Sequence, residues 1–201
     1  MSQLGHSGNS QYMGIENRTQ GICGICAALY AVYMDYKCLR DPLAEKLGTD
    51  TSRREFIQYE ILELLISYPE LHEEIEGLTH EFEGYEKFTI SDYVSVLSSK
   101  KTSDDYSIAL PPVAVVQYLK KWKIDATVNM SPHWSELPVR CILGLERSGL
   151  GLRHYVYKKG EKIFSYGRKF NNFESFSRTR GYTICCSIEW NSQPVVDISE
   201  Q

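Results

Sequence analysis

The spacing of apolar positions changes near residue 125. Before that point, several stretches carry apolar residues at the three-to-four-residue spacing of an α-helix. From Cys26 onward, small and apolar residues at 27, 30, 31 and 34 predict a buried helix. The segment 51–68, with Thr51 and Ser52 as candidate caps, and the segment 113–124, which follows two prolines, predict further helices.

The region between these helices is more polar. Residues 70–88 hold seven Glu and two His on a weak period, which is typical of a solvated helix or loop. Ser91 can cap a short helix that runs to Leu97, and the stretch 98–107 is rich in Ser, Lys and Asp and predicts a loop.

After residue 125 the pattern becomes that of strands. Alternating or β-branched runs predict strands at 125–130, 138–146, 153–158, 162–166 and 182–190. Helices followed by a mostly antiparallel sheet give an α+β fold. We expect a flexible segment over 1–18 and a single domain over 19–201, with a helical part (19–124) and a sheet part (125–192).

Composition narrows the function classes. The 201 residues carry a net charge of −4, so no general field favours nucleic acid or an anionic membrane. No apolar run is long enough for a signal peptide or membrane span, and six cysteines are too few for a disulfide scaffold. We expect a protein in a reducing compartment, either cytoplasmic or exported by a non-classical secretion system.

The segment from Gln20 to Cys26 carries the most specific chemistry. Two glycines lead into a helix whose first turn would hold Cys26, where the positive end of the helix dipole favours a thiolate. Gln20, six residues upstream, supplies an amide that can donate to a developing oxyanion. The pair predicts half of an acyl-transfer site.

These seven residues resemble the active-site motif of papain-like cysteine peptidases. In that family the Gln supports the oxyanion and the last Cys attacks, which the resemblance assigns to Gln20 and Cys26. The spacing also resembles that of the bacteriocin-processing, double-glycine peptidases and related bacterial effectors. The resemblance implies a papain-like fold in which the nucleophile helix packs on the antiparallel sheet.

His154 is the candidate base, because it follows the Cys in the order that the superfamily requires. If Lys159 and Gly160 form a two-residue turn, Ser165 lies directly opposite His154. The family usually orients the imidazole with Asn or Asp, so Ser165 departs from its pattern. Asn171 or Asn172 could serve instead.

The resulting hypothesis is a thiol hydrolase or acyltransferase that acts on a peptide, amide or isopeptide bond of a protein or peptide. No metal or organic cofactor is required. With 25 residues ahead of Cys26, no folded inhibitory propeptide is expected, so a regulatory or host protein partner, or delivery as an effector or toxin, would supply control.

Four alternatives stay open. The same site could run as a glutamine deamidase or transglutaminase, or the fold could be a catalytically inactive binding module. Cys23 and Cys26 also form a CxxC motif of the thioredoxin type, although no strand precedes it and no βαβ pattern is seen. Finally, each candidate has a structural interpretation, with Cys26 as a small core residue and His154 as an ordinary strand residue.

Overall fold

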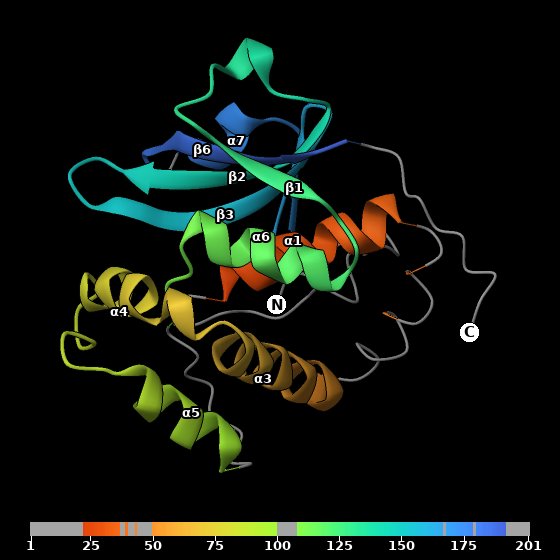
Figure 1. Ribbon diagram of the computed structural model, residues 1–201. Helices are drawn as coiled ribbons and strands as arrows, with labels where there is room; N and C mark the ends of the chain where they lie inside the picture. The colour runs from red at the N-terminus through yellow and green to blue at the C-terminus, as the bar shows by residue number, and fades with distance from the viewer. Residues whose placement is uncertain are drawn as a thin grey trace, which may run out of the picture.

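The computed structural model describes residues 22–36, 39, 43, 50–99, 108–166, 168–178 and 180–191. Side chains at 50–54 are also outside the description. The expected flexible segment 1–18, the loop at 100–107 and Gln20 therefore lie outside the described residues. In the described part, helices come first along the chain and strands last (Figure 1), which confirms the α+β class.

The helices largely follow the predicted segments. Their bounds are α1 (Cys23–Asp35), α3 (Asp50–Ser67), α4 (His72–His80), α5 (Ile90–Ser98) and α6 (Pro112–Lys121), with a 3₁₀ turn, η2 (Pro69–Leu71), before α4. The predicted cap of α5 was wrong. Thr89, not Ser91, accepts a hydrogen bond from the amide of Asp92, and the carboxylate of Asp92 accepts one from the amide of Thr89.

Six strands form one sheet in the order β1-β6-β2-β3-β4-β5, and every pairing among the described strands is antiparallel. Their bounds are β1 (Ala126–Met130), β2 (Arg140–Arg147), β3 (Gly151–Lys159), β4 (Lys162–Ser165), β5 (Arg168–Phe170) and β6 (Tyr182–Trp190). Three short elements were not predicted, since each is too brief to show a period: β5, the 3₁₀ turn η3 (Trp134–Glu136) and α7 (Phe173–Ser177).

The sheet separates two apolar cores. On one face, Tyr155 and Tyr157 pack with α1 and α6 in the larger core. On the other face, Leu143 and Val156 pack with Phe176 of α7. Figure 1 shows the same division, with α1 and α6 on one side of the sheet and α7 on the other. Side chains that alternate along β3 therefore enter different cores.

Every residue of helix α1 from Cys23 to Tyr33 is buried. This burial follows from a sequence that is apolar on all sides of the helix. Gly24 permits its close packing, since a Cβ atom there would lie 2.9 Å from Cγ2 of Val115 on α6. The helix begins at Cys23, three residues earlier than the pattern predicted. That shift changes which cysteine occupies the helix N-terminus.

No helix within the described ranges combines the length and the apolar composition that crossing a bilayer requires.

Candidate functional site

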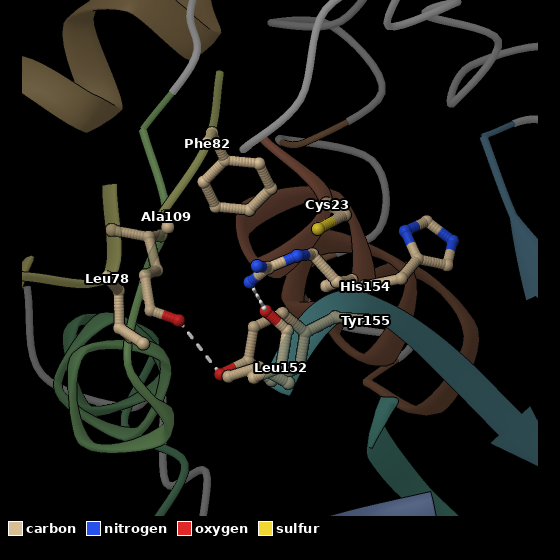
Figure 2. Close-up of a pocket in the computed structure, with 9 residues that line it drawn as sticks. Cys23, Leu78, Phe82, Ala109, Leu152, His154 and Tyr155 are labelled. Atoms are coloured by element: carbon tan, nitrogen blue, oxygen red, sulfur yellow. Dashed lines mark hydrogen bonds between the residues drawn. The ribbon is translucent and has the colours of Figure 1, made fainter. Parts of the chain in front are cut away.

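A small pocket opens where the N-terminus of α1 meets the beginning of β3. Figure 2 shows Cys23 and His154 on one side of the pocket and Leu78, Phe82 and Ala109 on the other. The remaining lining residues are Leu110, Leu152, Arg153 and Tyr155. The Tyr155 hydroxyl donates to the carbonyl of Leu110 at 2.9 Å, which ties β3 to the segment before α6.

Cys23 is the first residue of α1, and no side chain caps the helix at Ile22. The first-turn amides and the helix dipole therefore face the region of the Cys23 thiol. Burial raises the pKa of this thiol. Hydrogen bonds to the sulfur from the amides of Tyr155, Gly24 and Cys23, and from the Tyr166 hydroxyl, act in the opposite direction. All four donors would stabilise a thiolate once the proton has left.

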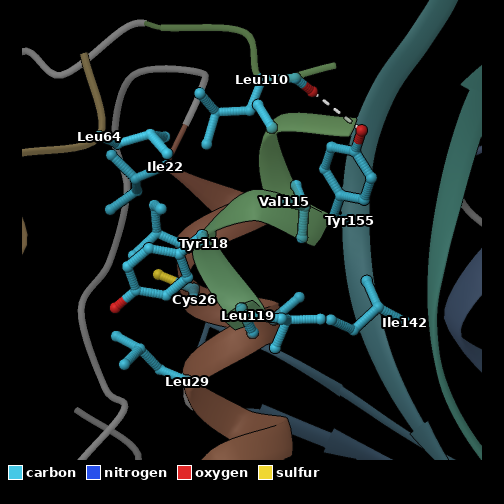
Figure 3. Packing of buried hydrophobic residues seen from close by; sticks show 14 of the residues in the cluster. Ile22, Cys26, Leu29, Leu64, Leu110, Val115, Tyr118, Leu119, Ile142 and Tyr155 are labelled. Carbon is cyan, nitrogen blue, oxygen red and sulfur yellow. Dashed lines mark hydrogen bonds between the residues drawn. The ribbon is translucent and has the colours of Figure 1, made fainter. Parts of the chain in front are cut away.

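Cys26, the expected nucleophile, lies elsewhere. It does not line the pocket, and Figure 3 shows its sulfur beside Tyr118 of α6 in the larger core. Burial, and then the neighbouring Cys23, raise the pKa of the Cys26 thiol. Its amide donates to the carbonyl of Ile22 at 3.0 Å, so this amide is not free to hold an oxyanion. Because α1 begins at Cys23, Cys26 sits one turn inside the helix.

His154 is buried on β3, with 8% of its surface exposed. Its imidazole stacks against Phe176 and Tyr182, in the core on the α7 side of the sheet. Burial lowers the pKa of His154 to about 4, and Arg180 acts in the same direction. The imidazole is therefore neutral at neutral pH.

Ser165 contacts His154, as expected, but the predicted turn of the β3–β4 hairpin was wrong: it lies one residue later along the chain. Lys159 pairs with Lys162, which leaves Gly160 and Glu161 as the turn. Because both strands shift together, Ser165 keeps the face of His154 and becomes its diagonal neighbour. Its hydroxyl oxygen lies 2.9 Å from Nε2 of His154.

The two asparagines considered as alternatives lie outside this contact. The side chain of Asn172 accepts a hydrogen bond from the amide of Ser175 and caps α7. Asn171 is exposed on the segment that leads into that helix.

Tyr166 connects the two halves of the site. Its hydroxyl donates to the Cys23 sulfur, and its ring centroid lies 5.2 Å from that of His154. Strict alternation along the strand would place Tyr166 on the face opposite His154, since Ser165 shares the face of His154. It instead follows β4 at a φ of 43°, a left-handed conformation that turns the ring toward the imidazole. Sequence periodicity contains no signal for such a turn.

No hydrogen bond joins either Cys23 or Cys26 to His154 within the described part of the chain. In Figure 2 the Cys23 sulfur points toward the pocket and the imidazole points away from it. The imidazole instead stacks on Phe176 and Tyr182 in the core on the α7 side. Cys23 and His154 therefore do not form a preformed ion pair. Both contact Tyr166, which bonds to the sulfur through its hydroxyl and packs its ring on the imidazole.

Arg153 bridges the pocket between β3 and the end of α4. Its guanidinium lies 2.8 Å from the carboxylate of Glu81 and 4.6 Å from the ring centroid of Phe82. The same group donates to the carbonyl of Leu152 at 3.0 Å. Arg153 is 12% exposed and Glu81 is 46% exposed, so the bridge lies at the mouth of the pocket.

Two further observations concern the CxxC alternative and the metal-ligating side chains. The antiparallel pairing of all described strands does not fit the thioredoxin type, whose CxxC follows a parallel strand. No group of three or more His, Cys, Asp or Glu side chains in the described ranges is arranged to hold a metal ion.

Comparisons with known proteins do not add a family assignment. No protein-family model matches the chain, and neither the curated proteins nor the solved structures contain a match.

Proposed function

We propose that the protein is a papain-like thiol hydrolase or acyltransferase in which Cys23, rather than Cys26, is the nucleophile. The observation that carries the proposal is that Cys23, at the start of α1, lines a pocket that His154 also borders, with the His154 imidazole held by Ser165 on the α7 side of β3. The substrate class is a peptide, amide or isopeptide bond.

The choice of Cys23 rests on access and on hydrogen bonds. Its sulfur lines the pocket and receives the four donors described above, whereas the thiol of Cys26 is enclosed by apolar side chains. A nucleophile must reach the substrate carbon, and donors directed at its sulfur lower the cost of ionisation. Gln20 then lies three residues before the nucleophile, so the proposed oxyanion donors are those first-turn amides of α1 that do not donate to the Cys23 sulfur.

His154 is the proposed general base, and Ser165 is its positioning residue. The contact between Nε2 and the Ser165 hydroxyl leaves Nδ1 as the nitrogen that can accept a proton. The imidazole is neutral at neutral pH, which is the form that a general base requires, but a pKa of about 4 makes it a weaker base than an exposed imidazole. Catalysis also requires His154 and Cys23 to approach each other, because catalytic hydrogen bonds often tighten only when substrate is bound.

The proposed reaction proceeds through a thioester. His154 takes the proton of Cys23, and the thiolate attacks the substrate carbonyl carbon, whose oxygen takes the negative charge. When the tetrahedral intermediate collapses, the bond to the leaving amine breaks and the imidazolium returns its proton to that amine. Water that attacks the thioester carbon gives hydrolysis or deamidation, and an amine that attacks it gives transglutamination. In each case His154 takes a proton from the attacking group, the C–S bond breaks, and the Cys23 thiolate takes that proton back.

A chromogenic acyl ester, p-nitrophenyl acetate, tests the proposal without knowledge of the natural substrate. We expect wild type to form an acetyl thioester on Cys23, seen by peptide mass spectrometry, and His154→Ala to slow acylation roughly 10²- to 10⁴-fold. Cys26→Ala is the matched control and should keep the wild-type rate if it folds. Acylation on Cys26, or equal rates in wild type and His154→Ala, would contradict the proposal.

A catalytically inactive binding module is the second candidate. It is favoured because, among the described residues, the side-chain hydrogen bond of His154 goes to the uncharged hydroxyl of Ser165, and burial disfavours the imidazolium. Under this alternative, p-nitrophenyl acetate would acylate Cys23 no faster in wild type than in His154→Ala.

A further inference from the structure

Strand β6 carries two adjacent cysteines, Cys185 and Cys186, outside the pocket. Neighbouring residues of a regular strand point to opposite faces of the sheet. Here the pairing with β2 is interrupted, because Gly144 pairs with Cys186 and the next residue, Leu145, pairs with Ile184. Cys185 is therefore the extra residue of a β-bulge, which changes the direction of its side chain.

The bulge brings the two thiols into contact. The Cys186 thiol donates a hydrogen bond to the sulfur of Cys185. Adjacent cysteines in a strand do not normally meet in this way, so the contact depends on the irregular register between Gly144 and Leu145.

Gly144 provides the space for this arrangement. A Cβ atom at residue 144 would lie only 2.3 Å from the Cys186 sulfur, which therefore occupies the place of a side chain. The same position is 3.3 Å from Cδ1 of Leu152 and 3.4 Å from Cε1 of Tyr155, two residues that line the pocket. Cys186 is fully buried, whereas Cys185 is half-buried and supplies access from solvent.

We propose that Cys185 and Cys186 form a two-sulfur site for a soft monovalent cation of the Cu(I) class. Thiolates are the ligands that Cu(I) prefers, and this ion accepts a coordination number of two. Zn²⁺ is a poor fit, since structural zinc sites take four ligands and no cluster of even three is present in the described ranges.

Binding involves no redox step. Two S–H bonds break, two S–Cu bonds form, and both protons pass to solvent. The hydrogen bond between the thiols is lost, and the metal takes the position between the sulfurs.

A competition titration with anaerobic Cu(I) and the chromogenic chelator bicinchoninate tests the site. It is carried out in a Cys23→Ala/Cys38→Ser background, which removes the CxxC motif and a cysteine outside the described residues. We expect one equivalent of Cu(I) to be held in this background and to be lost when Cys185→Ser or Cys186→Ser is added. Cys141→Ser, a buried cysteine on the opposite face of the sheet, is the control and should keep the equivalent.

Gly144→Ala supplies a test that leaves both thiols in place. The added Cβ must displace the Cys186 sulfur, so we expect Cu(I) affinity to fall roughly 10-fold or more. Circular dichroism checks that each variant folds. If the buried Cys186→Ser does not fold, the result for Cys185→Ser, at the half-buried position of the bulge, decides whether the site exists. Retention of the full equivalent in Cys185→Ser would overturn the proposal, whatever the result for Cys23.

Discussion

Nε2 of His154 lies 2.9 Å from the hydroxyl oxygen of Ser165, and both side chains are 8% exposed. The contact fixes one nitrogen of the imidazole but places no negative charge beside it. Burial therefore determines the protonation of His154, which is neutral down to a pKa of about 4.

Ser165→Asp should change this protonation directly. A carboxylate at this distance favours the imidazolium, so we expect the pKa of His154 to rise by roughly 1–3 pH units. The shift can be measured by NMR titration of the imidazole C–H signals. Ser165→Asn is the uncharged control and should leave the pKa within the range of wild type. An equal pKa in wild type and Ser165→Asp would show that Ser165 does not face the imidazole.

His154 also predicts a pH dependence of stability. Its pKa is about 4 in the folded state, against 6.5 for the unperturbed side chain, so the unfolded chain binds a proton first as the pH falls. The contribution of the neutral His154 side chain to the unfolding free energy is fully present above pH 6.5, and it is lost as the pH falls to 4. At 1.36 kcal/mol per pH unit, this gap corresponds to about 3 kcal/mol of unfolding free energy.

Urea unfolding of wild type and His154→Gln at pH 7 and pH 4.5 measures this contribution. Other groups titrate in both proteins, so the difference between the two proteins isolates His154. We expect wild type to lose more stability than His154→Gln, and identical losses would contradict the burial of a neutral imidazole.

Several elements could be predicted from local pattern because their causes are local. Pro111 precedes α6 and Pro112 is its first residue, since proline suits the first turn of a helix. The alternation near β6 reflects burial on the sheet. The turn of the β3–β4 hairpin was predicted one residue early. The sequence allows the two-residue turn to be either Lys159-Gly160 or Gly160-Glu161. The packing of the two strands selects Gly160-Glu161.

Arg153→Ala should open the pocket with little effect on stability. The ion pair with the half-exposed Glu81 is screened by solvent, so its loss should cost less than about 1 kcal/mol. Without the bridge between β3 and the end of α4, we expect iodoacetamide to modify Cys23 faster than in wild type. Arg178→Ala, which removes the exposed ion pair with Glu174, is the control. An unchanged or slower rate in Arg153→Ala would show that the bridge does not limit access.

Two glycine substitutions should act in opposite directions. Gly144→Ala places a Cβ 2.3 Å from the Cys186 sulfur in a packed core, so we expect a loss of roughly 1–3 kcal/mol. Gly77→Ala lies within α4, where no atom comes within 4 Å of the new Cβ, and should gain up to about 1 kcal/mol from helix propensity. Chemical denaturation measures both, and a stable Gly144→Ala would contradict the close approach of the sulfur.

The candidate site was predictable only in part. The CxxC segment and His154 are visible in the sequence, but the first residue of α1 decides which thiol reaches the pocket. Three residues turn a helix by about 300°, so Cys23 and Cys26 meet different surroundings. The role of Tyr166 depends on a left-handed turn that no periodicity predicts.

The most direct test of the central claim is the rate at which iodoacetamide modifies each cysteine, mapped by peptide mass spectrometry at neutral pH. We expect Cys23 to be modified well before Cys26, and His154→Ala to slow the modification of Cys23. Cys26, enclosed between α1 and α6, should react only under conditions that unfold the protein. Modification of Cys26 in the native protein, at a rate equal to or above that of Cys23, would contradict the assignment of Cys23 as the nucleophile.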